Sequence, residues 1–523
     1  VMVASVEQYL SKLISCRIFY FMNERNSRAG EPPLVSHWIP FIGSALDFGK
    51  APLEYLQSLQ KRLGDVFTIK LAGWNVHVFM NPHDVPNLER AKNIDHKNVI
   101  GDFVSRMVGD EHMIHNPARH SDAVPKILES TLRSTMHLMT LCDSCTNVLP
   151  KTIKRTLKSE FNCKRETKVC IVMQIGLYEL CKKLVSDMTL NLFFGSIASD
   201  EKCNEETKQI CEEFFVYFKS SALLVDRIPI HLLPATKKSR GRLFELLSRF
   251  DFENRDNVSE LINLTCFIHT EYILRTSSSE EKVRHLLIIL WSAQANTLPA
   301  LFWTLFYILN DKTARIDVLE EFEKHKQKTS TLISSFNYIH YFIHDNKFLI
   351  IFLDSCTKET MRMTGSSLAA RRAHADTTVT LASGQEYKIR KGDYTSYFAP
   401  VTHQDADIYD KPEEYRHKRF LQHDDKDPSM LKSRTQFSKN GKRISPSTSI
   451  MTFGYGAVRC PGRHIALMEI KFLTLVLLRH FDIKLVKNYS RQSEDYPQFD
   501  LTHLGFGVMP PSRDVDVTLS IKN

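Results

Sequence analysis

Residues 453–462 constrain this chain more than any other segment. They read Phe-Gly-Tyr-Gly-Ala-Val-Arg-Cys-Pro-Gly, and a helical pattern begins directly after them at Arg463. Cys460 therefore lies where a glycine-rich loop meets a helix N-terminus, and Pro461 suits an early helical position. Unpaired backbone N–H groups and the positive end of the helix dipole favour a thiolate there. The pattern predicts a cysteine thiolate rather than a buried structural thiol.

Such a thiolate is suited to bind a flat, metal-containing macrocycle. Gly456 and Gly462 have no side-chain bulk, so the macrocycle could lie close to the backbone. A buried, hydrogen-bonded thiolate is the axial ligand that pushes electron density onto haem iron and promotes O–O cleavage. We therefore predict haem b (iron protoporphyrin IX) as the cofactor and Cys460 as the ligand of its iron. Phe453, Gly456 and Gly462 complete the predicted haem-binding loop.

The loop resembles the haem-binding loop of the cytochrome P-450 family. Many members carry an Arg or His two residues before the cysteine to hold a haem propionate, and this chain has Val458 there. The resemblance implies that other residues hold the propionates, and Arg371 is similar to one such contact. The alternative for Arg371 is a surface arginine. The implied fold is mainly α with small β-sheets, the cytochrome P-450 fold, in a single large haem-binding domain.

A second motif is Glu-Thr-Met-Arg, which begins at Glu359. The i, i+3 spacing puts Glu359 and Arg362 on one face of a helix, where they can pair. By itself this is most often a surface ion pair, which stabilises little. Here the motif follows an apolar run at 348–356 and precedes Cys460 by about 100 residues, as in the P-450 family. The resemblance implies that the pair is buried, that Arg419 joins it, and that the network fixes the proximal side so that haem can load.

Residues 286–309 are nearly all apolar, with Asn296, Thr297 and Pro299 in their middle. Because Pro299 lacks an N–H, the carbonyl of Ala295 loses its helical partner and the helix should bend. Polar groups beside a buried bend could hold dioxygen or water and pass on protons; alternatively, they only satisfy the bend. In the P-450 family this position lies over the haem and often carries an acid–alcohol pair. The resemblance makes Thr297 the retained alcohol, and Asn296, a neutral amide, is expected to orient a chain of water.

The run that ends at Pro299, Trp-Ser-Ala-Gln-Ala-Asn-Thr-Leu-Pro, is similar to one branch of the family. That branch contains cholesterol and oxysterol 7α-hydroxylases, sterol 12α-hydroxylase and prostacyclin synthase. Further segments that agree with it are 47–56, 228–234 and 505–511. The resemblance implies a monooxygenase that hydroxylates a sterol or oxysterol, as in cholesterol and bile-acid metabolism. It would use O2 and electrons from an NADPH-dependent flavoprotein reductase.

Two other functions stay open. The first is an isomerase of fatty-acid endoperoxides like prostacyclin synthase, which needs neither a reductase nor proton delivery. Thr297 argues against it, because prostacyclin synthase lacks a threonine at that position. The second is a haem- or sterol-binding protein without turnover. Val458 and the weak match to the family over about 95–200 leave this alternative open.

The remaining sequence predicts one domain over residues 44–523, since no stretch within it has the composition of a linker. Pro32, Pro33 and Pro40 make 31–43 a stiff, extended hinge. Short strands are expected within 65–80, turning at 72–74, and within 377–389. Most of the rest is expected to be helical, notably 205–220, 281–309, 348–363 and 461–480.

Charge and cysteine usage indicate the surroundings of the protein. A net charge of +9, spread along the chain, fits a membrane surface or an acidic redox partner, and no motif for nucleic acid is present. Eleven irregularly spaced cysteines fit a reducing compartment. Residues 1–30 read as a membrane-associated segment, either an interfacial helix or the remnant of an anchor. We expect an endoplasmic reticulum membrane protein whose catalytic domain faces the cytosol.

Overall fold

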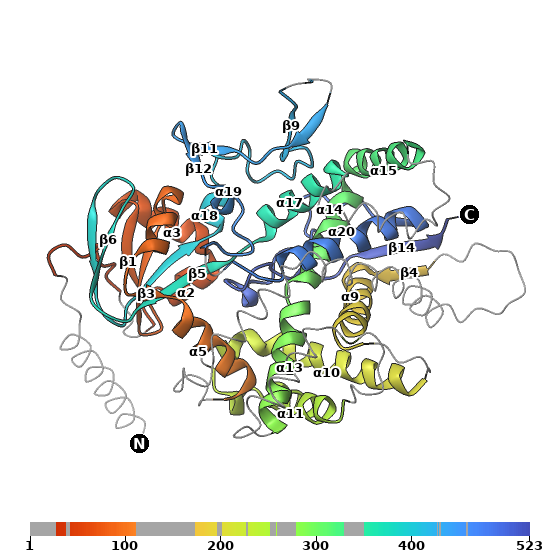
Figure 1. The fold of residues 1–523 in the computed structure, drawn as a ribbon, viewed down its shortest axis with the longest axis horizontal. Helices are drawn as coiled ribbons and strands as arrows, with labels where there is room; N and C mark the ends of the chain where they lie inside the picture. Colours follow the sequence, from red (N-terminus) through yellow and green to blue (C-terminus); the bar gives the residue numbers. More distant parts are fainter. Residues whose placement is uncertain are drawn as a thin grey trace, which may run out of the picture. The chain divides into compact units, whose positions relative to one another are not determined.

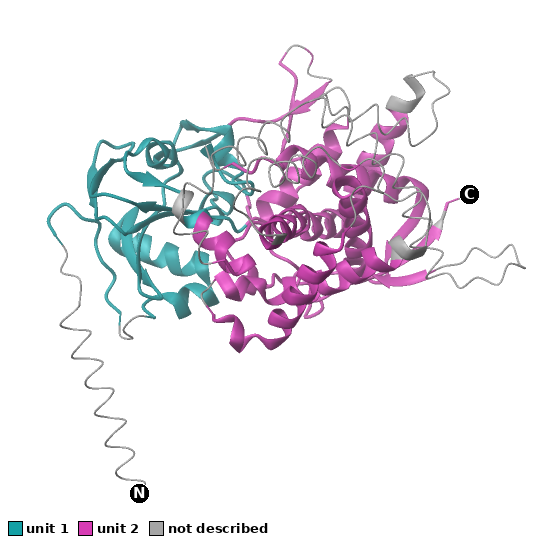
Figure 2. Ribbon diagram, turned by 60° about the horizontal axis from the view of Figure 1, so that its bottom comes forward, with its two compact units in different colours: residues 1–100, 366–410, 437–458 teal, residues 101–365, 411–436, 459–523 magenta. Residues whose placement is uncertain are grey.

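A computed structural model of the chain describes residues 28–37, 42–110, 173–195, 201–225, 228–250, 258, 279–328, 350–425, 427, 430–456 and 459–522. The chain forms two compact units, shown in Figure 2. Unit 1 consists of residues 1–100, 366–410 and 437–458, and unit 2 consists of residues 101–365, 411–436 and 459–523. Each unit therefore combines segments that are far apart in the sequence.

A mixed sheet with the strand order β1-β2-β8-β5-β3 forms the centre of unit 1. β1 and β2 are an antiparallel hairpin joined at Ala72 and Gly73, which both have positive φ, as the tightest hairpin turns require. β8 pairs in parallel with β2 and antiparallel with β5. The strands are Val66–Leu71 (β1), Trp74–Phe79 (β2), Ile94–Asp95 (β3), Leu368–Ala373 (β5) and Tyr394–Phe398 (β8).

Short helices and hairpins complete unit 1. They are α2 (Ala45–Lys50), α3 (Pro52–Leu63), η1 (Pro82–Asp84), α4 (Val85–Arg90), β6 (Thr377–Thr380), β7 (Glu386–Ile389), α18 (Pro400–His403), β11 (Phe437–Lys439), β12 (Lys442–Ile444) and α19 (Pro446–Ser449). Residues 33–35 run beside β1. The N–H of Val35 donates to the carbonyl of Thr68 (2.9 Å), and the N–H of Thr68 donates to the carbonyl of Pro33 (2.8 Å). Glu31 forms an ion pair with Arg390, which fixes the start of this segment to unit 1.

Long helices dominate unit 2 (Figure 1). They are α9 (Leu177–Phe193), α10 (Glu201–Val225), α11 (Pro234–Ser248), α13 (Ser279–Gln294), α14 (Thr297–Asn310), α15 (Lys312–Lys328), α17 (Ile351–Thr364) and α20 (Arg463–His480), with most of α5 (Lys97–Val108). Smaller elements are η2 (Ile230–Leu232), η5 (Leu501–His503), the pair β9 (Leu421–His423) and β10 (Leu431–Ser433), and a sheet of β13 (Phe481–Leu485), β14 (Asp516–Ile521) and β4 (Met173–Gly176).

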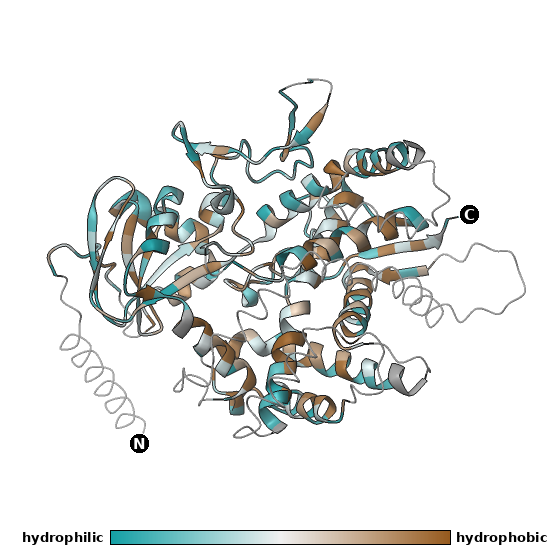
Figure 3. Cartoon of the chain, in the orientation of Figure 1, coloured by the Kyte–Doolittle hydropathy of each residue, from teal (hydrophilic) through white to brown (hydrophobic). Residues whose placement is uncertain are grey.

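The core of unit 2 is built around α14 and α20, which pack against each other and against α17. Every residue from Thr297 to Ile308 is buried, as is every residue from Met468 to Leu478. A helix that is apolar on all sides must be covered on all sides, whereas the charged α15 remains partly exposed. Figure 3 shows this contrast between brown α14 and mostly teal α15.

The segment Glu280–Asn310, which spans α13 and α14, has the length and apolar composition of a membrane-crossing helix. It is the one such helix in the described part of the chain, and 67% of its most apolar window is buried inside the protein. A core helix has the same composition, so the segment does not by itself indicate a membrane span.

The local predictions agree with these elements. Both strand regions form hairpins, and helices cover most of the described part of each range expected to be helical, except for residues 295–296, 350 and 461–462. The bend expected near Pro299 is a break between α13 and α14 at Ala295 and Asn296. Residues 1–27 of the expected membrane-associated segment lie outside the described residues.

Candidate functional site

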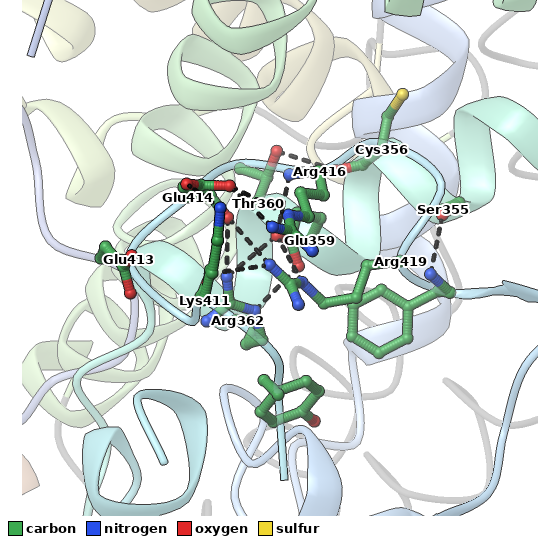
Figure 4. Close-up of polar contacts among 12 residues, drawn as sticks. Ser355, Cys356, Glu359, Thr360, Arg362, Lys411, Glu413, Glu414, Arg416 and Arg419 are labelled. Atoms are coloured by element: carbon green, nitrogen blue, oxygen red, sulfur yellow. Dashed lines mark hydrogen bonds and ion pairs between the residues drawn. The ribbon is translucent and has the colours of Figure 1, made fainter. Parts of the chain in front are cut away.

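Glu359 and Arg362, predicted as a pair, both lie on α17 with fully buried side chains. Arg362 donates from Nε to Oε2 of Glu359 (2.8 Å) and from Nη2 to Oε1 (2.9 Å). Arg419 donates from Nε to the same Oε1 (2.9 Å) and is itself 5% exposed (Figure 4). The structure therefore brings the three predicted residues into one buried network. A bidentate arginine–carboxylate pair fixes geometry as well as charge.

Backbone groups of the segment after Asp410 complete this network. The N–H of Arg416 donates to Oε1 of Glu359 (3.0 Å), and Nη2 of Arg419 donates to the carbonyls of Lys411 (3.1 Å) and Glu414 (3.0 Å). The network thus ties α17 to a loop more than fifty residues later. Sequence reasoning missed the part of Arg416, because a backbone donor leaves no signal in the residue type.

His417, in the same loop, is held between two carboxylates. Its Nδ1 lies 3.2 Å from Asp311 and its Nε2 lies 2.8 Å from Asp317, which also pairs with Lys418. Burial alone would lower the pKa of His417, but the hydrogen bonds and charges of the two aspartates outweigh burial and raise it. The imidazolium form is therefore favoured in the folded protein.

We expect this contact to make the stability of the protein depend on pH. A histidine whose pKa is raised on folding contributes fully below its unfolded pKa of about 6.5, and its contribution is lost as pH rises through the folded pKa. The free energy of unfolding of the wild type should therefore exceed that of a His417→Asn variant by more at pH 6 than at pH 8.5. Urea titrations at both pH values measure this, and an equal difference at both would contradict the role of the imidazolium.

Cys460 is a free, half-buried cysteine two residues before the N-cap residue Gly462 of α20. Burial raises the pKa of its thiol, while the N–H groups of Gly462 and Arg463 and the charge of Arg463 lower it. The helix end therefore favours the thiolate. In the absence of a metal, however, burial has the larger effect on the pKa of Cys460. A coordinated metal ion would supply the missing stabilisation, because a coordinating thiol is deprotonated outright.

The two glycines of the loop meet different constraints. Gly456 has φ of 61°, and a Cβ there would lie only 1.9 Å from Oε1 of Glu89. The positive φ therefore favours glycine, whatever else the loop binds, while the flexible side chain of Glu89 would have to shift to admit a Cβ. A Cβ at Gly462 would lie 3.9 Å from Sγ of Cys460, an ordinary contact. Phe453 is half-buried at the start of the loop.

Arg371 is buried in unit 1 on β5, with 3% of its surface exposed, so the surface alternative is wrong. Its guanidinium carbon lies 5.1 Å from the centre of the Tyr455 ring. Nε and Nη2 of Arg371 are buried and make no hydrogen bond to a described residue. A buried guanidinium without an acceptor is costly, so these N–H groups fit an anionic ligand.

The break between α13 and α14 exposes polar groups inside unit 2. Asn296 accepts a hydrogen bond on Oδ1 from the N–H of Val508 (2.8 Å), and a Cβ at Gly507 would lie 2.4 Å from the same oxygen. Asn296 therefore holds a distant loop, in addition to any water it orients. The hydroxyl of Thr297 makes no hydrogen bond to a described residue, whereas Thr304 donates to the carbonyl of Ala300 (2.7 Å).

Aromatic rings lie beside this break. Phe103 packs against Trp291 and Phe506, with ring centres 5.3 and 5.7 Å apart. The loop that carries Phe506 is fixed further along, where Trp303 donates from Nε1 to the carbonyl of Met509 (2.8 Å). The result is a group of packed aromatic rings close to the break, suited to contact an apolar ligand.

Some sequence expectations fall outside the described residues. Val458 is one of them, as is most of the range 95–200 in which the resemblance was weak. Sequence reasoning did not single out Phe103, which becomes recognisable only through its ring contacts, nor Tyr455, whose partner lies in a distant strand.

Comparison with known proteins places these observations in a family. The family model for cytochrome P450 matches residues 32–514. The chain belongs to the cytochrome P450 family. It is 30% identical to "Cholesterol 7-alpha-monooxygenase" of Cricetulus griseus, covering 98% of each chain. It is 28% identical to the human "7-alpha-hydroxycholest-4-en-3-one 12-alpha-hydroxylase" (94% of this chain, 93% of the relative) and to the prostacyclin synthase of Bos taurus (95% of each).

Family membership implies haem as the cofactor of this P450, and the residues present fit it. Cys460 offers a sulfur ligand at the start of a helix, and Arg371 offers buried donors without a protein acceptor. A thiolate-ligated haem supplies the activation of O2 and the insertion of one oxygen atom into a C–H bond. The roles of Phe453, Gly456, Gly462, Glu359, Arg362 and Arg419 toward this cofactor remain predictions.

Proposed function

We propose that this P450 monooxygenase hydroxylates a sterol or oxysterol in the manner of the 7α-hydroxylases. The observation that carries the proposal is the hydroxyl of Thr297, which bonds to no described residue. It lies at a break in a buried helix, next to the Asn296 that holds the loop of Phe506. A hydroxylase needs a proton donor near the bound oxygen, and a sterol needs an apolar wall. The similarity to relatives named as sterol 7α- and 12α-hydroxylases supports the same substrate class.

In this proposal each residue at the break has a separate task. Thr297 holds its hydroxyl proton at the break, where it would serve as the proton donor for the oxygen chemistry that haem supplies. Asn296 holds the backbone at Val508, which fixes the loop that carries Phe506. The rings of Phe103, Trp291 and Phe506 exclude water and orient the apolar body of the substrate. The electrons come from an NADPH-dependent flavoprotein reductase.

Optical titration of the purified ferric protein tests the substrate class. The panel contains cholesterol, side-chain oxysterols, a bile-acid intermediate and an endoperoxide analogue. A high-spin shift of the Soret band with one sterol class, followed by reductase-dependent NADPH consumption, is the expected result. A response to the endoperoxide analogue alone would favour the isomerase instead, and a response to sterols without any NADPH consumption would favour a binding protein.

We further propose that the catalytic domain faces the cytosol and rests on the endoplasmic reticulum membrane through residues 228–233. Ile228 and Leu232 are 39% and 63% exposed there, so these side chains do not pack inside the protein. Lys237 and Lys238 follow on the exposed surface of α11. Exposed apolar side chains followed by cations fit the surface of an anionic bilayer.

Replacing Leu232 by serine should weaken this attachment. If Leu232 is buried in lipid, its transfer contributes about 1.5–3 kcal/mol, so the partition coefficient should fall roughly tenfold or more. Flotation of the full chain with vesicles containing anionic lipid measures the bound fraction. Ile316→Ser is the matched control, because Ile316 is 53% exposed on α15. Equal binding by both variants would contradict the proposed contact.

A further inference from the structure

Among the described residues of unit 1, two neighbouring hydrogen-bond donors are buried and have no acceptor. One is the guanidinium of Arg371, through Nε and Nη2, and the other is the hydroxyl of Tyr455. Tyr455 is 2% exposed, and its ring lies under the guanidinium. Groups that are buried without partners are rare in folded proteins, and each calls for a ligand, an ion or a water.

The other large buried tyrosines of unit 1 do not share this feature. The hydroxyl of Tyr409 donates to the carbonyl of Ser449 (2.7 Å), and the hydroxyl of Tyr397 lies 2.7 Å from Oγ1 of Thr402. Tyr455 differs from them by standing in the predicted haem-binding loop, five residues before Cys460. Its lack of a partner therefore coincides with the place where a ligand is expected.

The charges around Tyr455 indicate what kind of ligand fits. Burial raises the pKa of Tyr455 more than the charge of Arg371 and its hydrogen-bonding contact with the phenol lower it. The phenol therefore stays neutral and keeps its own proton for donation. Glu89 lies against Gly456, and its negative charge also raises the pKa of Tyr455. A cation with two unpaired N–H groups beside a neutral O–H donor suits a carboxylate brought by the ligand.

We infer that Tyr455 binds haem: its hydroxyl, beside Arg371, donates a hydrogen bond to a propionate carboxylate of the cofactor. The inference rests on haem binding by this P450, and it is independent of the sterol substrate. The position two residues before Cys460, which often carries a basic residue in the family, is Val458 and has no donor. Tyr455 supplies a donor three residues earlier in the same loop.

Tyr455→Phe tests the inference, because it removes the hydroxyl and keeps the ring under Arg371. Losing one hydrogen bond to a charged group should accelerate haem transfer to excess apomyoglobin roughly tenfold to hundredfold. The apoprotein should be as stable as the wild type or more stable, because the variant removes a buried donor that had no acceptor. A purely structural tyrosine would instead lower the stability of the apoprotein.

Tyr409→Phe is the matched control, since that hydroxyl is already bonded to Ser449. It should lower the unfolding midpoint of the apoprotein and leave the rate of haem transfer close to that of the wild type. Arg371→Gln provides a second, independent variant, which should also accelerate haem release. If Tyr455→Phe and Arg371→Gln both release haem as slowly as the wild type, the inference is wrong. Failure of the sterol titration would not affect this result, because haem transfer is measured without substrate.

Discussion

Replacing Cys460 by serine should remove the thiolate signature of the haem and reduce substrate oxygenation to background. The thiolate is the ligand that makes O–O cleavage favourable, and a serine hydroxyl cannot replace its electron donation. The half-buried position of Cys460, with two backbone N–H groups directed at its sulfur, gives the thiolate a prepared site. We expect this substitution to reduce activity more than any other single substitution in the protein.

The measurement combines the spectrum of the reduced carbonyl complex with NADPH-driven turnover. Cys460→His keeps a ligand for iron and should retain haem while losing oxygenation, which separates cofactor binding from chemistry. Cys211→Ser is the matched control, because Cys211 is also a half-buried cysteine outside any disulfide, on α10. If Cys460→Ser kept the thiolate spectrum, another cysteine would be the ligand and the assignment of the loop would fail.

Local features of the sequence predicted much of the fold. The strands around Ala72 and the break before Pro299 depend on neighbours in the chain, namely on turn residues with positive φ and on a missing N–H. Cys460 at the start of α20 is a feature of the same kind. Periodicity and the special backbone properties of Gly and Pro are written in the sequence itself, so these elements could be located without the structure.

The partners of the site residues could not be located in this way. Asn296 binds the backbone of Val508, 212 residues later, and the residue type of Val508 plays no part in that bond. Tyr455 lies under Arg371 because β5 is in the same unit as the loop, and no spacing in the sequence expresses this. The sequence therefore predicts that these polar groups lie at a bend or in a loop. Their roles depend on contacts that only the fold provides.

Glu359→Gln should lower the free energy of unfolding by about 3–5 kcal/mol. Glu359 is fully buried and accepts hydrogen bonds from Arg362, Arg419 and the backbone of Arg416. Removing its charge takes away the carboxylate with which both buried guanidinium groups pair. That desolvation cost is larger than the free energy that an exposed pair contributes. Urea unfolding measures the change, and Glu320→Gln, which breaks the exposed pair with Lys324, should have little effect.

A double variant distinguishes an effect of the Glu359–Arg362 network on protein stability from a direct role of its charges in haem loading. Replacing both Glu359 and Arg362 by apolar residues of similar size removes the two charges of the buried pair together, and such a replacement often restores stability. Arg419 would keep its hydrogen bonds to the carbonyls of Lys411 and Glu414. If the network acts only through stability, Glu359→Leu/Arg362→Met should regain stability and haem content together, relative to Glu359→Gln. Recovered stability with low haem content would show that these charges are needed for the cofactor to load. A double variant that is no more stable than Glu359→Gln would place the cost on the buried charge of Arg419, which the double variant leaves without Glu359.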